Sequence, residues 1–274
     1  MKQILKTELS RAIKNRGMLL ALTIGIGIAL VHAVHVMLPA YYVNLEIDFE
    51  RYPILYPAIV ADTWLAGNEF ALESFLYFLV LPLLAVLPFG TSYFSDKENG
   101  FLKSLYMRVS RKDYLLAKYA AAFVSGGVAS VVPLIVNLLC ALTLLPNLRP
   151  EIVMPHNIIS AANLFYKIYY ANPMLYIFIF LCIDFMAGGI FACMALACSY
   201  LSDYKIIIAI CPFFIQLILH VGSSMLMKLD YSSVYFLEAG YGIREPLVAI
   251  LCMILGLCLP FTVFVKKGEK EDVF

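Results

Sequence analysis

Long apolar runs dominate this chain, and short polar segments separate them. A helix needs about 20 apolar residues to cross the hydrocarbon core of a bilayer, and six runs reach that length. We expect membrane-spanning helices near 18–38, 74–94, 117–145, 173–201, 206–227 and 246–265. The fourth and fifth runs are separated only by the Ser-Asp-Tyr-Lys sequence, which predicts a tight helical hairpin. The pattern therefore predicts an all-α membrane protein with six transmembrane helices.

Lysine and arginine are distributed unevenly between the segments that connect these runs. If the N-terminus is inside, 15 of the 20 basic residues lie in inner segments. The other five, in outer segments, are Arg51, Arg149, Lys167, Lys228 and Arg244. Basic residues accumulate on the cytoplasmic side of membrane proteins. We therefore expect both termini and the segment 95–116 to be cytoplasmic.

Composition agrees with a membrane protein and excludes several other classes. Hydrophobic residues make up 62% of the 274 residues and charged residues 14%, whereas soluble domains carry about 25% charged residues. A net charge of +1 argues against nucleic acid as the main partner. The seven cysteines all lie inside apolar runs, which argues against an extracellular disulfide framework or a zinc site of the CxxC type. We expect them to be free thiols.

The outer connecting segments 39–73, 146–172 and 228–245 are rich in tyrosine. The residues are Tyr41, Tyr42, Tyr52, Tyr56, Tyr166, Tyr169, Tyr170, Tyr231, Tyr235 and Tyr241. Tyrosine suits the boundary between lipid and water because its ring is apolar and its hydroxyl is hydrated. We expect short interfacial helices here; a carbohydrate-binding surface is the alternative.

The N-terminal stretch 1–17 has the pattern of an amphipathic interfacial helix. Its apolar face holds Met1, Leu5, Leu9, Ala12 and Ile13, and the basic residues fall mostly on the other side. A basic amphipathic helix lies flat on a membrane surface. It is either a simple positive anchor or an elbow helix that also contacts a cytoplasmic partner. We treat 1–274 as one domain, with the six-span bundle at 18–265 and a cytoplasmic tail at 266–274.

The segment 95–118 is unusually charged, since nine of the 23 residues from 96 to 118 carry charge. Ser95 and Glu98 have the spacing of a capping box, and Ser110 and Asp113 repeat it. An apolar stripe lies between them: Phe101, Leu102, Leu105, Tyr106 and Val109. This pattern predicts a short amphipathic helix at 97–107. The helix could lie on the inner leaflet, belong to a solvated loop, or dock its apolar face in a groove of a cytoplasmic protein.

The sequence of this segment resembles the loop after the second span of ABC-2 type transporter permeases. That family has a Glu-x-Gly turn, an amphipathic coupling helix, a Ser/Thr-Arg pair, an aromatic residue and Gly-Lys. The matching positions here are Glu98, Gly100, Ser110, Arg111, Tyr114 and Lys118. Ala117 stands where the family usually has glycine. Chain length, the six expected spans and the N-terminal helix also resemble the family, whereas 228–245 is short for the re-entrant helices of several members.

The resemblance implies the membrane-spanning subunit of a bacterial ABC exporter, in the cell membrane with both termini in the cytoplasm. A separate ATPase subunit would bind ATP-Mg, and a second permease subunit would complete a homodimer or heterodimer. This chain would bind no cofactor and catalyse no reaction; it contains no G-x-x-x-x-G-K-[ST] phosphate loop. The cargo would be an amphipathic or hydrophobic peptide, lipid or drug. The residues expected to couple to the ATPase are Glu98, Gly100, Phe101, Leu102, Leu105, Tyr106 and Arg111.

A few polar residues lie deep in the expected spans. Asp184 is the only acidic one, and His32, His220 and Gln216 lie at similar depth. Because a charge in the bilayer centre costs about 2.5–3.5 kcal/mol, Asp184 should face protein or water. It is either a structural, hydrogen-bonded group or part of a transport or proton pathway. His32 and His35 alone do not supply enough ligands for a metal site.

Small residues in two spans suggest close helix contacts. They are Ser125, Gly126, Gly127 and Ser130 in the third span, and Ala187, Gly188, Gly189 and Ala192 in the fourth. Two other classes of protein remain as alternatives. A six-span intramembrane protease would use His220 with Ser223 or Ser224, and a membrane anchor or immunity protein would act alone.

Overall fold

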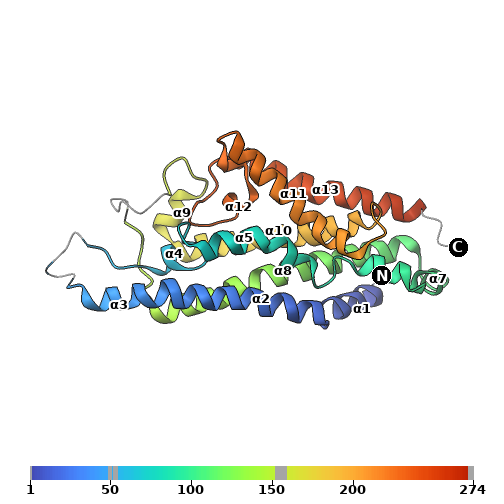
Figure 1. The fold of residues 1–274 in the computed structure, drawn as a ribbon, viewed down its shortest axis with the longest axis horizontal. Helices are drawn as coiled ribbons and strands as arrows, with labels where there is room; N and C mark the ends of the chain where they lie inside the picture. Colours follow the sequence, from blue (N-terminus) through green and yellow to red (C-terminus); the bar gives the residue numbers. More distant parts are fainter. Residues whose placement is uncertain (1, 49–50, 52–54, 152–158, 271–274) are drawn as a thin grey trace.

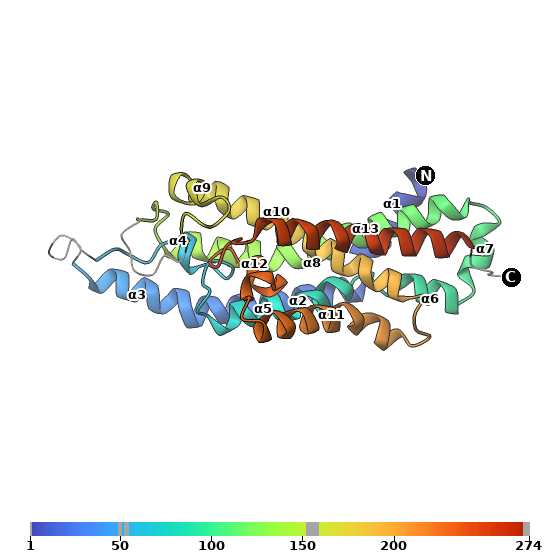
Figure 2. The same ribbon diagram turned by 90° about the horizontal axis from the view of Figure 1, so that it is seen from above.

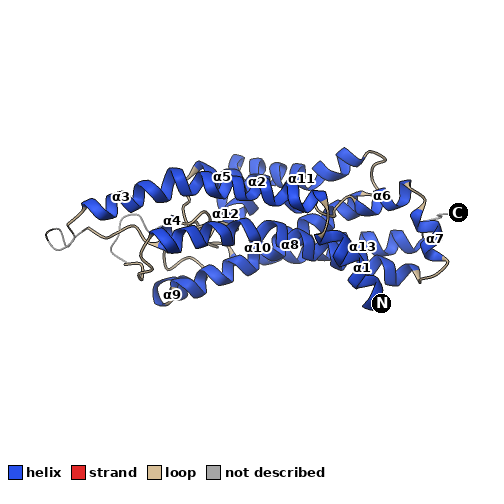
Figure 3. Ribbon diagram, turned by 90° about the horizontal axis from the view of Figure 1, so that it is seen from below, coloured by secondary structure: helices blue, strands red, loops and turns tan. Residues whose placement is uncertain are grey.

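The computed structural model describes residues 2–48, 51, 55–151 and 159–270. These residues form helices and loops, with no strand among them (Figure 3). Tyr52, Met1 and the end of the expected tail, 271–274, lie outside the described residues. The helices lie roughly along one direction and build an elongated bundle (Figure 1).

The helices follow one another from α1 to α13. Their bounds are α1 Lys2–Ile13, α2 Arg16–His32, the π-helical turn η1 Ala33–Met37, α3 Leu38–Glu46, α4 Val60–Thr63, α5 Leu72–Val86, α6 Ser92–Glu98, α7 Phe101–Tyr106, α8 Arg111–Leu144, α9 Tyr166–Ala171, α10 Pro173–Cys198, α11 Lys205–Met225, the 3₁₀ turn η2 Leu229–Tyr231, α12 Ser233–Phe236 and α13 Pro246–Lys270.

Among the described residues, five helical segments are long and apolar enough to cross a membrane. They are Arg16–Glu46, Arg111–Leu144, Pro173–Cys198, Lys205–Met225 and Pro246–Glu269. The chain is therefore a multi-pass membrane protein. The expected second span is shorter than predicted, because α5 has only 15 residues and ends at Val86. Pro88 follows, and it lacks the amide hydrogen that would continue a helical hydrogen-bond ladder.

The first span is longer than predicted and runs from α2 through η1 into α3. The turn η1 ends at Met37, two residues before Pro39, which is the second residue of α3. A wider π-helical turn lets the helix pass a residue that cannot donate a backbone hydrogen bond. Helix α8 is also long: its 34 residues rise about 51 Å, well beyond a hydrocarbon core of about 30 Å.

The two ends of the bundle differ in character. Both termini, α1, α6, α7 and the turn 199–204 lie at one end, which we call the basic end (Figures 1 and 2). The end of α3 and the short helices α4, α9 and α12 lie at the other, which we call the opposite end (Figure 1). The short helices predicted for the outer segments are thus present. The turn 199–204 confirms the predicted hairpin between α10 and α11.

Small residues bring α8 and α10 into direct backbone contact. A Cβ atom added to Gly126 would lie 2.5 Å from the backbone oxygen of Gly188. A Cβ atom added to Gly188 would lie 2.1 Å from the hydroxyl oxygen of Ser130. The predicted contact between the small residues of these two spans is therefore confirmed.

The N-terminal helix ends in an elbow at Asn15. The Asn15 side chain accepts a hydrogen bond from the amide of Met18 at 2.7 Å, which caps α2. It also donates to the backbone oxygen of Pro88 at 2.9 Å, so the elbow lies against the end of α5. Ala12 is buried as predicted, but Ile13 is exposed and Glu8 lies on the buried side of α1. The predicted apolar face is wrong for Ile13, because the helix packs through its Glu8 and Ala12 side.

Candidate functional site

The loop expected to hold one amphipathic helix holds two. Helix α6 ends at Glu98, and α7 begins at Phe101. Gly100 between them has a left-handed φ of 69°, which a residue without Cβ adopts readily. Ser95 lies inside α6, so the predicted capping box at Ser95 and Glu98 does not start a helix. The single helix predicted at 97–107 is therefore wrong.

The second predicted cap is confirmed at the start of α8. Ser110 has an extended backbone, and its hydroxyl oxygen accepts a hydrogen bond from the amide of Asp113 at 3.2 Å. This cap fixes where α8 begins. Helix α7 is thus held between a glycine turn on one side and a capped helix start on the other.

Most of the apolar stripe of α7 is covered by the chain itself. Leu102 is completely buried, and Leu105 and Tyr106 pack partly against the same core. The Tyr106 ring lies 5.9 Å from that of Tyr114, between centroids. Phe101 remains 41% exposed. The interpretation of the whole stripe as a free docking face is therefore wrong, because Leu102 belongs to the interior.

The outer surface of α7 and the turn that follows combines apolar and basic groups. Met107 is 76% exposed, and Lys103 and Arg108 are also exposed. The Phe101 ring contacts the guanidinium of Arg11, whose carbon lies 5.4 Å from the ring centroid. We call Phe101, Lys103, Met107 and Arg108 the α7 surface.

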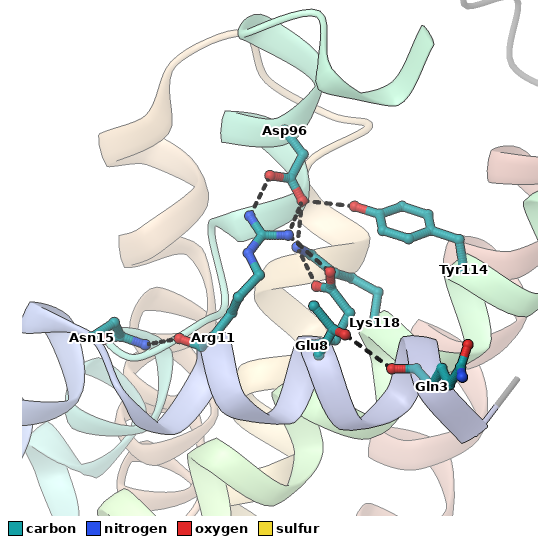
Figure 4. Close-up of polar contacts among 8 residues, drawn as sticks. Gln3, Glu8, Arg11, Asn15, Asp96, Tyr114 and Lys118 are labelled. Atoms are coloured by element: carbon teal, nitrogen blue, oxygen red, sulfur yellow. Dashed lines mark hydrogen bonds and ion pairs between the residues drawn. The ribbon is translucent and has the colours of Figure 1, made fainter. Parts of the chain in front are cut away.

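A largely buried cluster of polar and charged side chains contacts α7 through Arg11 and Tyr114. We call it the ion network: Glu8, Arg11, Asp96, Tyr114 and Lys118 (Figure 4). Lys118 is fully buried, and its Nζ lies 3.0 Å from Glu8 Oε2 and 2.5 Å from Asp96 Oδ2. Arg11 binds the other oxygens of the same carboxylates, at 2.8 Å from Glu8 and 2.7 Å from Asp96. The Tyr114 hydroxyl donates to Asp96 at 2.7 Å.

The positive and negative charges of the ion network are equal in number. Two carboxylates face two cations, so the formal net charge of the ion network is zero. Burial alone would raise the pKa of the Asp96 carboxyl, but the Arg11 hydrogen bond and the Lys118 charge hold that pKa below its ordinary value. Burial likewise opposes the charge of Arg11, yet Asp96 and Glu8 raise its pKa overall. Asp96 and Arg11 are therefore charged at neutral pH.

The ion network joins three helices around α7. Glu8 and Arg11 belong to α1, Asp96 to α6, and Tyr114 and Lys118 to α8. Lys118 and Tyr114 match the family pattern, but the pattern alone did not identify Glu8, Arg11 or Asp96 as their partners. A usable signal was present in Glu8, which lies one helical turn before Ala12 on the buried face of α1. An acid on a buried face needs a cation from another element.

The polar residues predicted inside the bundle do not form one site. The His32 Nδ1 lies 3.2 Å from the Asn137 amide nitrogen, and the Gln216 amide donates to the Phe78 backbone oxygen at 2.7 Å. His220 pairs with Ser232, at 2.8 Å between Nδ1 and Oγ. Within the described ranges, no group of three metal-ligating side chains occurs.

Asp184 is as deeply buried as predicted but not hydrogen-bonded. Its exposed fraction is 0%, and neither carboxyl oxygen has a hydrogen-bond partner among the residues that the structure describes. The expectation of a structural, hydrogen-bonded Asp184 is therefore wrong.

The geometry does not assemble the protease dyad considered above. Ser223 and Ser224 both donate to the backbone oxygen of His220, at 2.8 and 2.9 Å, and not to its ring. The ring instead pairs with Ser232, which is fully buried and caps α12.

An apolar cavity of about 530 Å³ lies among α10, α11, α12 and α13. Its lining includes Ile190, Ile215, Phe236 and Leu255, and Gln216 is one of its few polar members. Such a cavity suits an apolar chain or ring system, since it offers few hydrogen-bonding groups.

A scan against protein-family models finds no family that matches this chain, and a search of curated proteins finds no match. The fold and the site define a multi-pass, all-helical membrane protein with a buried ion network at its basic end. The family remains a resemblance, carried by the residues between Glu98 and Lys118.

Proposed function

We propose that the chain is the membrane-spanning permease subunit of a bacterial ABC exporter. The observation that carries this proposal is the position of α7. It is a short surface helix, seated on an ion network that joins α1, α6 and α8. A force on α7 would reach three helices at once, and two of them lead directly into membrane-spanning segments.

In this proposal the basic end faces the cytoplasm, and a separate ATPase subunit binds ATP-Mg there. The ATPase contacts the α7 surface: Phe101 and Met107 supply apolar contacts, and Lys103 and Arg108 supply a basic rim. Leu102, Leu105 and Tyr106 hold α7 on the bundle instead of touching the partner. Glu98, Gly100 and Arg111 flank α7 and set its position.

The cargo in this proposal is amphipathic or hydrophobic. The apolar cavity among α10, α11, α12 and α13 supports this choice, because it could hold an apolar group of a peptide, lipid or drug. A second permease subunit, identical or related, would complete the transporter.

The double variant Phe101→Ser, Met107→Ser tests this function. Fully burying one such side chain contributes about 1.5–3 kcal/mol, and each 1.4 kcal/mol is tenfold in affinity. We expect at least roughly a tenfold loss of affinity for the proposed partner, a Walker-motif ATPase to be sought among the products of adjacent genes. Coupled transport should fall with it. The melting temperature should fall only slightly, because Met107 is 76% and Phe101 41% exposed and the spans are untouched.

Met227→Ser is the matched control, because Met227 is 92% exposed and lies outside the α7 surface, between α11 and α12. It should leave ATPase binding unchanged. If the double variant still co-purifies with the ATPase at wild-type stoichiometry, the α7 surface is not the docking site. If the wild type binds no such ATPase, the chain acts alone, as an anchor or immunity protein would.

A further inference from the structure

Three buried carboxyl groups have oxygen atoms without hydrogen-bond partners in the described part of the chain. Asp184 lies in the middle of α10, Glu238 lies two residues after the end of α12, and Glu69 lies between α4 and α5. Asp184 is fully buried and Glu238 almost so. Both oxygens of Asp184, Oε1 of Glu238 and Oε2 of Glu69 are buried and unpaired. Such groups are rare in native proteins, and each calls for a physical explanation.

Backbone contacts hold Glu238 between the other two elements. The amide of Gly240 donates to the oxygen of Ala66 at 2.8 Å, which places the Glu238 segment against the Glu69 loop. The Tyr176 hydroxyl donates to the oxygen of Ala239 at 2.8 Å, which places the same segment against α10. Asp184 lies about 12 Å further along α10, two helical turns from Tyr176.

The electrostatic interactions between the three carboxyl groups also place Glu238 between Asp184 and Glu69. Glu238 acts on Asp184, and Glu69 acts on Glu238. The other titratable or charged groups that act on the three are Tyr77 beside Asp184, and Arg244 and Asp62 beside Glu69. Among Tyr77, Arg244 and Asp62, only Arg244 is a cation. It acts on Glu69, which is the least buried of the three carboxyl groups.

Three negative charges in this position would be very unfavourable. An ionised carboxylate that is buried without a partner costs several kcal/mol, so the protonated form is favoured. Burial and the nearby Glu69 charge raise the pKa of Glu238 to about 9. Burial raises the pKa of Glu69 to about 7, against the opposing effect of Arg244.

We infer that Asp184, Glu238 and Glu69 form a proton-binding site that extends from the opposite end of the bundle to the middle of α10. At neutral pH the site holds protons on its buried carboxyls. Loading adds one proton to a carboxylate oxygen and forms an O–H bond, and release breaks that bond and returns the proton to water through Glu69. The inference does not depend on the transport function proposed above.

Infrared spectroscopy of the purified full chain in dodecyl maltoside tests this site. The C=O stretch of protonated carboxyls, identified by its shift in D₂O, is followed from pH 4 to pH 11. Exposed carboxyls should lose this band near their ordinary pKa of about 4. Part of the wild-type band should persist and decline with midpoints near 7 and 9. A wild-type band that is gone by pH 6 overturns the inference, whatever the variants do.

Isosteric variants assign the band. Glu238→Gln should remove the component near pH 9, and Asp184→Asn should lower the band amplitude at pH 7 by one carboxyl. Glu69→Gln should move the Glu238 midpoint below 9, because the charge of Glu69 helps to raise it. Asp203→Asn, at an exposed position of the basic end, is the control and should leave the persistent band unchanged. If the Glu238 component of the band declines at the same pH in Glu69→Gln as in the wild type, Glu69 and Glu238 do not interact. That result would overturn the inference of a shared site.

Discussion

Replacement of Lys118 by methionine should destabilise the protein through a single buried charge. Lys118 is fully buried, and it is bound to Glu8 and Asp96 at 3.0 and 2.5 Å. Its Nζ also lies 4.3 Å from the centroid of the Phe89 ring. Methionine has a similar length and no charge, so Lys118→Met leaves two carboxylates facing Arg11 alone.

The size of the effect follows from the charge that remains. Removing one partner of a buried ion pair typically costs about 3–5 kcal/mol, because the other charge stays buried and uncompensated. At about 2–4 °C per kcal/mol, the melting temperature should fall by roughly 6–20 °C. Changing Glu8 to glutamine in addition restores neutrality. Lys118→Met, Glu8→Gln should therefore recover at least half of the loss.

Thermal unfolding in detergent, followed by circular dichroism at pH 7, measures these differences. The pKa of Asp96 lies below its ordinary 3.8, so the stabilisation it contributes is fully present at pH 7. That contribution is lost only as the pH falls through the folded-state pKa. Lys112→Met is the matched control, because Lys112 is an exposed lysine on the same helix. Exposed substitutions usually change stability by no more than about 0.5 kcal/mol.

Two results would refute this reasoning. If Lys118→Met melts at the same temperature as Lys112→Met, the ion network does not stabilise the basic end. If the double variant Lys118→Met, Glu8→Gln is less stable than Lys118→Met alone, the neutral net charge of the ion network is not the source of its stabilising effect.

Two further predictions concern topology and the hairpin at the basic end. With the native cysteines replaced, an impermeant thiol reagent added outside should label Leu45→Cys but not Ser104→Cys; outside labelling at 104 would reverse the orientation. In the native chain, the sulfur atoms of Cys198 and Cys211 lie 2.9 Å apart. Oxidation with diamide should therefore link these two, as peptide mass spectrometry would detect; no 198–211 link would contradict the packing of α10 on α11.

The fold was largely predictable because the spans depend on length and hydrophobicity alone. Five of the six expected spans are present, and the turn before Lys205 falls where the polar residues placed it. The errors occurred where backbone chemistry intervenes. Pro88 ends the apolar helix α5 early, and the π-helical turn before Pro39 lets the first span continue to Glu46.

The site was less predictable because it depends on contacts between distant segments. Hydrophobic periodicity indicated that Leu102 lies on an apolar face, but not that α1 and α8 already cover that face. The ion network combines Glu8, Asp96 and Lys118, which are far apart in the sequence. The hydrophobic pattern within one helix contains no information about ion pairs between residues of different helices. The left-handed turn at Gly100 was visible as a glycine, but its consequence, two helices instead of one, was not predicted.

The glycine contact between α8 and α10 limits how this protein can change shape. With backbone against side chain at Gly126, Gly188 and Ser130, the two helices have no room to slide past each other by a turn. We therefore expect α8 and α10 to move as one rigid body. Lys118 and Asp184 belong to that body, so a tilt imposed at the basic end displaces the buried acid in the same motion. Any relative movement then falls to α11, α12 and α13, which form the other walls of the apolar cavity.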